Sequence, residues 1–213
     1  MTPDEVANFL RNNPGFFEQY PGVLAQLKVP DPHGGRAIPL SERQLLSLRD
    51  RNRSLEGKLS ELIHFGEEND TIGAKVHELA VILLRVTTIE GALGCIHGSL
   101  RDDFAVPHVA IRLWRGESDQ PEFAPVDEAV HRYAANLEQP FCGPSIELAP
   151  ATWFSAGSDH VRSLALVPLK DSEGAFGLVA LGSEEPRRFF PEMGTLYLGR
   201  IGELMSAVLG RVI

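Results

Sequence analysis

The sequence predicts an α+β fold: an antiparallel sheet flanked by helices and preceded by an N-terminal helical arm with a coiled-coil segment. The first observation is a pair of apolar runs, 164–169 and 175–181, separated by a polar loop over 170–174 that ends in glycine. A connection of this length closed by glycine is typical of a β-hairpin. Both runs are apolar on both strand faces, so we expect them in the middle of the sheet with a layer on each side. The second observation is a heptad repeat of leucines between residues 45 and 62, which is the pattern of a coiled coil.

Length, charge and cysteine count narrow the class of protein. A chain of 213 residues has room for one well-buried core and an appendage. The net charge of −9 disfavours binding to nucleic acid or to an anionic membrane surface, and no apolar run approaches the ~20 residues of a membrane span. The N-terminus is acidic where a secretory signal is basic, and two cysteines supply no disulfide framework. We therefore expect a cytoplasmic protein without membrane or nucleic-acid partners.

Residues 1–40 are predicted to be a helical arm followed by a linker. Thr2 and Glu5 have the spacing of a capping box, with Pro3 at the first helical position. The aromatic residues that follow are accompanied by too few other apolar residues to form an independent core. We therefore expect this segment to dock on the same chain or on a second copy. The proline- and glycine-rich stretch 29–39 is typical of a linker.

Residues 41–67 are predicted to be a coiled-coil helix, which a second capping box begins at Ser41. The a and d positions of its heptads are Leu45, Leu48, Asn52, Leu55, Leu59 and Leu62. An asparagine at one a position fixes the register and the number of strands in a parallel dimer. The pattern therefore favours a homodimer with these residues at its interface. The alternative is a surface helix that packs on its own domain.

Residues 68–213 are predicted to form the globular domain. The heptad frame breaks near 66–69 and a new apolar stripe begins three residues out of phase, so we expect the first helix over 68–87 and a bend or a change of partner before it. A second helix reaching to about residue 104, a strand over 106–115 and a helix from Asp127 to Pro140 follow. A short strand over 141–148 and a helical turn over 150–154 lead into the hairpin.

The last helix is predicted to begin at Pro191 and to have two unlike faces. The large residues on one face are Met193, Tyr197, Ile201, Leu204 and Val208, and the small residues opposite are Thr195, Gly199, Gly202, Ser206 and Gly210. An interior glycine costs a helix about 1 kcal/mol relative to alanine, which indicates a close neighbour. We expect that neighbour to be the 68–87 helix of this chain or of a second copy, so Gly199, Gly202 and Ser206 join the predicted dimer interface.

The order of these elements resembles that of the GAF fold, and S-L-A-L-V-P-L followed by G-A-F-G-L-V-A-L resembles its signature hairpin. More narrowly, the chain resembles the uncharacterised bacterial domain-of-unknown-function family 484. The stretches that carry this resemblance are N-P-G-F-F at 13–17, S-E-R-Q-x-x-x-L-R at 41–49, Cys142-Gly143 and R-F-F-P-E-M-G-T at 188–195. The resemblance implies a GAF-like domain behind a helical arm and no established activity. GAF domains at large imply small-molecule sensing and dimerisation through the first and last helices.

The sequence lacks the motifs that several ligands and reactions require. The signature of cyclic-nucleotide-binding GAF domains is missing, and no motif for a bilin accompanies either cysteine. The seven histidines include no pair at i, i+4 and no His-Glu-x-x-His, so we expect no metal site. There is no phosphate-binding loop or nucleophile elbow, and serines beside His160 do not make a catalytic triad by adjacency in sequence. We expect no cofactor and assign no catalytic residue.

The remaining candidates for a ligand pocket are Arg112, Trp114, Cys142, Trp153 and Phe154. Arg112 alternates with apolar residues and is either solvated or an anion contact, while the aromatic residues line a pocket or belong to the core. A reactive Cys142 requires a neighbouring cation or helix N-terminus, and the alternative is a small buried apolar residue.

The sequence as a whole favours a GAF-like sensing or regulatory module that acts as a homodimer, with an unknown small molecule and an unknown protein partner. Two alternatives stay open. One is a thiol-dependent enzyme using Cys142, similar to the GAF-fold free-methionine-sulfoxide reductases. The other is a structural adaptor without a ligand.

Overall fold

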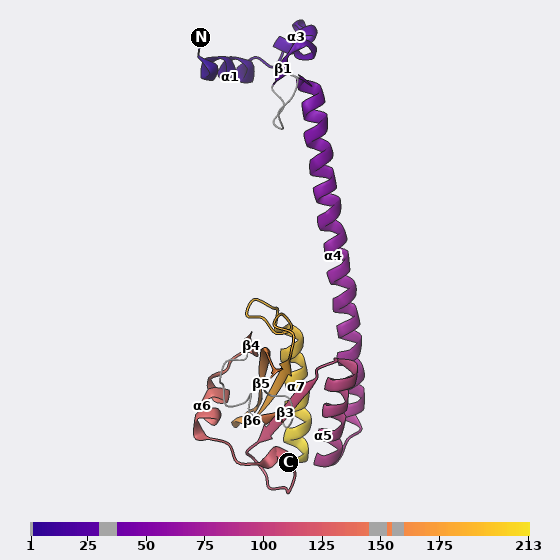
Figure 1. The fold of residues 1–213 in the computed structure, drawn as a ribbon, viewed down its shortest axis with the longest axis vertical. Coiled ribbons are helices and arrows are strands. Elements are labelled where there is room, and N and C mark those ends of the chain that lie inside the picture. The colour runs from indigo at the N-terminus through magenta and orange to yellow at the C-terminus, as the bar shows by residue number, and fades with distance from the viewer. Residues whose placement is uncertain (1, 30–37, 145–152, 155–159) are drawn as a thin grey trace. The chain divides into compact units, whose positions relative to one another are not determined.

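A computed structural model describes residues 2–29, 38–144, 153–154 and 160–213 (Figure 1). The chain divides into two compact units, Met1–Glu67 and Glu68–Ile213. Parts of the strand predicted over 141–148 and of the turn predicted over 150–154 lie outside the described residues, as does most of the 29–39 linker.

The first unit begins with three short helices: α1 (Pro3–Asn12), α2 (Phe16–Gln19) and α3 (Pro21–Gln26). The predicted capping box of α1 is confirmed. The hydroxyl oxygen of Thr2 accepts from the Glu5 amide at 3.3 Å, and the Glu5 carboxylate accepts from the Thr2 amide at 2.7 Å. Two-residue strands β1 (Lys28–Val29) and β2 (Ile38–Pro39) then pair antiparallel. No described side chain of α1 or α2 is buried.

One helix, α4 (Leu40–Leu84), runs through both the predicted coiled-coil segment and the predicted first helix of the domain. The first helix of the domain therefore does not begin near residue 68 as expected, because it continues the coiled-coil helix, and it ends at Leu84 rather than near residue 87. Seven-residue steps onward from Leu62 reach Asn69, Val76 and Leu83, and the last two are buried in the second unit. The d positions of the heptad repeat thus continue into the domain. The apolar residues at the other heptad positions change there. The side chain of Ser41 lies outside the described part of the structure.

The second unit is built on a four-stranded antiparallel sheet in the order β3-β6-β5-β4. Its strands are β3 (His108–Leu113), β4 (Phe141–Pro144), β5 (Ser163–Asp171) and β6 (Gly174–Ser183). The predicted hairpin is confirmed as the central pair, and the α+β class is confirmed with it. The hairpin loop is shorter than predicted, because the pairing of Lys170 with Ala175 and of Asp171 with Gly174 leaves a two-residue turn. Gly174 has φ +122°, which residues with a side chain rarely adopt.

Helices cover both faces of this sheet (Figure 1). On the first face, Ile111, Val167 and Val179 belong to the larger core, together with side chains from α5 (Ile89–Gly98), α7 (Leu196–Val212) and the end of α4. A π-helical turn, Ser99–Asp103, extends α5. On the second face, side chains of α6 (Glu128–Asn136) form a smaller core with β5 and β6. A 3-10 turn, Pro121–Phe123, precedes α6.

The terminal helix α7 begins at Leu196, five residues later than predicted, because a turn occupies the residues after Pro191. Its large face contributes to the larger core. Hydrogen bonds of 2.8 Å join each end of α7 to the region of α4: the Tyr197 hydroxyl donates to the Asn69 carbonyl, and Arg211 donates to the Val86 carbonyl. These contacts place α7 between the sheet and the C-terminal part of α4.

The small face of α7 packs on the sheet rather than on a helix, which corrects the expected partner. A Cβ atom added to Gly202 would lie 2.5 Å from Val167 Cγ1 of β5. The Ser206 hydroxyl oxygen accepts from the Lys170 amide at 3.0 Å. Gly199 has open space around it. Small residues on a helix face indicate a close neighbour, and here that neighbour is a strand.

Candidate functional site

Four of the five predicted pocket residues gather on or beside the second face of the sheet. Arg112 alternates along β3 with residues of the larger core, which places it on the face that α6 covers, and Trp114 follows at the end of the strand. Trp153 and Phe154 pack in or against the smaller core on this face. Cys142 belongs to the larger core on the opposite face. The predicted set is therefore divided by the sheet.

Arg112 is a half-buried cation without a carboxylate partner among the described residues. Its Nη1 donates to the Ile111 carbonyl at 2.8 Å. The guanidinium carbon lies 5.2 Å from the centre of the Trp153 ring, a cation–π contact. Burial lowers the pKa of Arg112, and the negative charge of Glu122 partly opposes this effect. The guanidinium stays charged at neutral pH and is only partly hydrated.

Trp114 is held in one orientation by two contacts. Its indole N–H donates to the Ala175 carbonyl at 2.9 Å. Its ring stacks on His131 of α6 with centroids 4.5 Å apart and an interplanar angle of 28°. The Nε2 atom of His131 is buried and has no hydrogen-bond partner among the described residues. Sequence reasoning missed His131, because only the folded contact with Trp114 distinguishes it from an ordinary helix residue.

Phe154 belongs to the core, which was the alternative considered for it. It is buried, and its ring lies 5.7 Å from that of His108. A Cβ atom added to Gly182 of β6 would lie 2.9 Å from the Phe154 ring, so the glycine makes room for it. The candidate site therefore consists of Arg112, Trp114, Trp153 and His131, and we call these four residues the Arg112 cluster.

Cys142 has the surroundings of a structural cysteine. It pairs with Ala165 across β4 and β5 and is buried. Burial raises the pKa of its thiol to about 11, so the thiol stays protonated at neutral pH. A nucleophilic cysteine needs the opposite shift. These surroundings therefore give no support to a thiol-dependent enzyme that uses Cys142.

A groove of about 430 Å³ runs beside the small face of α7. The predicted interface residues Gly199, Gly202 and Ser206 line it together with Val167 and Pro168 of β5. The ammonium of Lys170, also at the groove, donates to the Ala135 carbonyl at 2.8 Å. These predicted interface residues therefore border a groove of this unit.

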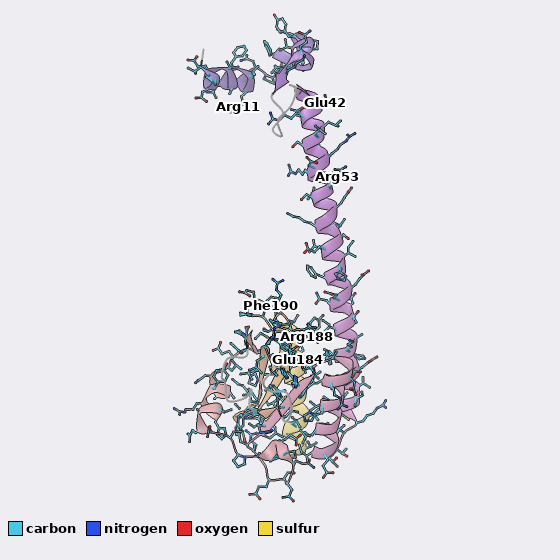
Figure 2. The ribbon with its side chains drawn as sticks, viewed as in Figure 1. Arg11, Glu42, Arg53, Glu184, Arg188 and Phe190 are labelled. Carbon is cyan, nitrogen blue, oxygen red and sulfur yellow. The ribbon has the colours of Figure 1, made fainter. Side chains whose placement is uncertain are left out.

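The predicted heptad leucines in the first unit are exposed. Leu48 is 64% exposed and Leu62 is 67% exposed, and the other leucines at these positions are about half exposed. Figure 2 shows polar side chains such as Glu42 and Arg53 projecting from the same helix. In the same unit, an apolar hollow of about 340 Å³ is lined by side chains of α1, α2, α3 and the residue after α3. No described residue of this chain covers the leucines.

Two further kinds of site are absent from the described part of the chain. No three histidine, cysteine, aspartate or glutamate side chains gather there in a group that would hold a metal ion. No helix among the described residues combines the length and apolar character needed to cross a bilayer.

Comparison with solved structures finds chains of similar fold, among them GAF domains. The GAF domain of the potassium sensor histidine kinase KdpD from Escherichia coli is 15% identical, with a TM-score of 0.43 over 66% of this chain and 94% of that one. The NLH2 GAF domain from A. aeolicus is 16% identical, with a TM-score of 0.47 over 67% and 97%. Free methionine-R-sulfoxide reductase from Neisseria meningitidis is 17% identical, with a TM-score of 0.47 over 64% and 87%.

Comparison with curated proteins finds no match. Comparison with protein families is decisive, because the model of one family, described as "Protein of unknown function, DUF484", matches residues 1–213. The match covers the arm, the hairpin and the terminal helix. The chain belongs to the DUF484 family.

Proposed function

We propose that this protein is a GAF-like sensing or regulatory module that acts as a homodimer. The Arg112 cluster takes up a small molecule, and the exposed part of α4 joins two copies. The protein that receives the signal is a further partner of unknown identity. The observation that carries the proposal is the half-buried guanidinium of Arg112, which lies against Trp153 without a carboxylate partner among the described residues.

The free-energy cost of burying the charge of Arg112 favours the binding of a ligand at this cluster. Burying a charge without a paired, hydrogen-bonded group is unfavourable. Among the described residues, backbone and aromatic contacts compensate Arg112 only in part, since one of its five N–H groups donates there, to the Ile111 carbonyl. Trp114 is held beside the same sheet face by its hydrogen bond to Ala175 and its stacking on His131. Aromatic side chains with one charged group are typical of the lining of small-molecule sites.

A second copy is the natural cover for the leucines of α4. In a parallel pair of helices, Arg51 at a g position meets Glu56 at the following e position of the other copy, and the charges are opposite. In an antiparallel pair, g positions face one another, and Arg51 would meet basic Arg51 or Lys58. Two Asn52 side chains meet in the parallel register. The charge pattern therefore supports a parallel homodimer.

Helix α7 provides a physical connection between ligand and dimer. Gly202 packs directly on Val167 of β5, one of the two central strands of the sheet. Tyr197, one and a half turns earlier, hydrogen-bonds to Asn69, which is a d position of the heptad repeat on α4. Movement of the sheet on ligand binding would therefore displace α7 and, through Asn69, the helix that carries the dimer contacts.

Native mass spectrometry of the gently purified full chain tests the proposal. We expect a complex of two chains that retains a small molecule. The variant Arg112→Met should form the same complex without the molecule. A complex of bare mass in both samples would favour a structural adaptor, and a single chain would contradict the homodimer.

A further inference from the structure

The hydrogen-bonding capacity that Arg112 leaves unused among the described residues indicates the charge of its ligand. A guanidinium has five N–H donors in one plane, and Nη1 makes the one hydrogen bond found among the described residues, to the Ile111 carbonyl. The remaining donors lie on a half-buried cation. An anionic acceptor satisfies such donors with charge-assisted hydrogen bonds, and a carboxylate does so with two parallel bonds to the planar fork.

The carboxylates of the described residues do not fill this role. Glu122 is close enough to raise the pKa of Arg112 slightly. However, Oε1 of Glu122 lies 3.0 Å from Nε2 of His97, which pairs it with α5. No ion pair joins Arg112 to any carboxylate in the described ranges. Arg112 is also the only arginine or lysine in the cluster, so a ligand with a single negative charge matches it.

Two indole rings on the same sheet face as Arg112 indicate the shape of the ligand. The Trp153 ring lies over the guanidinium at 5.2 Å. Trp114 is two residues onward from Arg112, which places its backbone about 7 Å away. Its orientation is fixed by Ala175 and His131. A ligand with a flat ring and a conjugated carboxylate would offer a stacking surface to an indole and two acceptors to the guanidinium.

We propose that the Arg112 cluster binds a small planar aromatic monocarboxylate, with Arg112 holding the carboxylate and the two tryptophans flanking the ring. This inference rests on the proposed function and names the chemical class of its ligand. A tetrahedral phosphate meets only half of these requirements, because it supplies acceptors for Arg112 but no flat surface for the indoles. His131 positions Trp114 by stacking.

Intrinsic fluorescence measures this binding directly. The chain contains two tryptophans, Trp114 and Trp153, and both belong to the cluster. We use benzoate as the probe, benzamide as its neutral analogue and inorganic phosphate as an anion without a ring, each titrated into the full chain. Benzoate should quench the emission saturably, and benzamide and phosphate should bind at least tenfold more weakly.

Variants test the role of Arg112. Arg112→Met should weaken benzoate binding at least tenfold, and Arg112→Lys, which keeps the charge but loses the fork, should weaken it several-fold. Arg132→Met, at an exposed position of α6, is the matched control and should bind within twofold of the parent. If Arg112→Met does not fold, Arg112→Lys and the comparison of benzoate with benzamide decide the question.

Equal affinities for benzoate and benzamide, equal affinities of the parent and the folded Arg112 variants, or no saturable quenching by benzoate would each overturn the inference. Tighter binding of phosphate than of benzoate would overturn it as well. Different results would refute the proposed function. A molecule retained in native mass spectrometry that benzoate does not displace refutes the ligand class alone, whereas a complex of bare mass refutes ligand sensing itself.

Discussion

Two glycines one turn apart on α7 allow a sharp test of how this helix packs. Gly199 has no atom within 4 Å of an added Cβ, whereas at Gly202 an added Cβ would lie 2.5 Å from Val167 Cγ1. Replacing glycine by alanine inside a helix is worth about 1 kcal/mol in intrinsic propensity. At Gly199 that gain is realised. At Gly202 it is opposed by overpacking, which costs about 1–3 kcal/mol, because the added Cβ meets Val167 Cγ1 of the buried strand β5.

We therefore expect Gly199→Ala to stabilise the protein by up to about 1 kcal/mol and Gly202→Ala to be less stable than Gly199→Ala by about 1–3 kcal/mol. In a chain of 213 residues each kcal/mol corresponds to about 2–4 °C in Tm. Urea unfolding of both variants and the parent, followed by circular dichroism, measures the difference. Equal stabilities of the two alanine variants would refute the close contact between α7 and β5.

Three further predictions concern the arm, the joint and the buried thiol. Asn52→Leu should tighten the dimer by a few kcal/mol, on the scale of about 1.5–3 kcal/mol for each buried leucine, and unchanged association in sedimentation equilibrium would contradict this. Tyr197→Phe should cost about 1 kcal/mol in urea unfolding through loss of the bond to Asn69, whereas Tyr133→Phe, for which no hydrogen bond is found among the described residues, should cost less. Because the pKa of Cys142 is raised to about 11, the folded state keeps this proton longer than the unfolded state. Stability should therefore fall between about pH 9 and 11, less so in Cys142→Ala.

The hairpin and the heptad repeat were predictable because each is a local pattern. Apolar residues on both faces of two short runs require burial on both sides, and their loop ends in glycine. Leucines at a and d positions likewise define one helix face without knowledge of the fold. A separate domain helix was predicted from about residue 68, after a bend or a change of partner, because the apolar residues change near 66–69. Backbone continuity does not depend on that change, and α4 continues past Gly66.

The candidate site was harder to predict because it depends on register and on partners distant in sequence. A shift of one residue in strand pairing moves a side chain to the other sheet face. The pairing of Cys142 with Ala165 places the thiol in the larger core, away from Arg112. The small residues of α7 indicated a close neighbour but not its kind, and that neighbour is β5. His131 gave no signal in sequence, since its stacking on Trp114 exists only in the fold.

The central claim is that a second copy covers the exposed leucines of α4 in parallel register. Oxidative cross-linking of Leu55→Cys tests it most directly, because d positions of a parallel pair face each other. Arg53→Cys, on the outer surface of the helix, is the control, and the unsubstituted chain gives the background. We predict a disulfide-linked dimer for Leu55→Cys at concentrations where Arg53→Cys remains at background. Equal cross-linking of the two variants, or none at Leu55→Cys, would contradict the parallel homodimer.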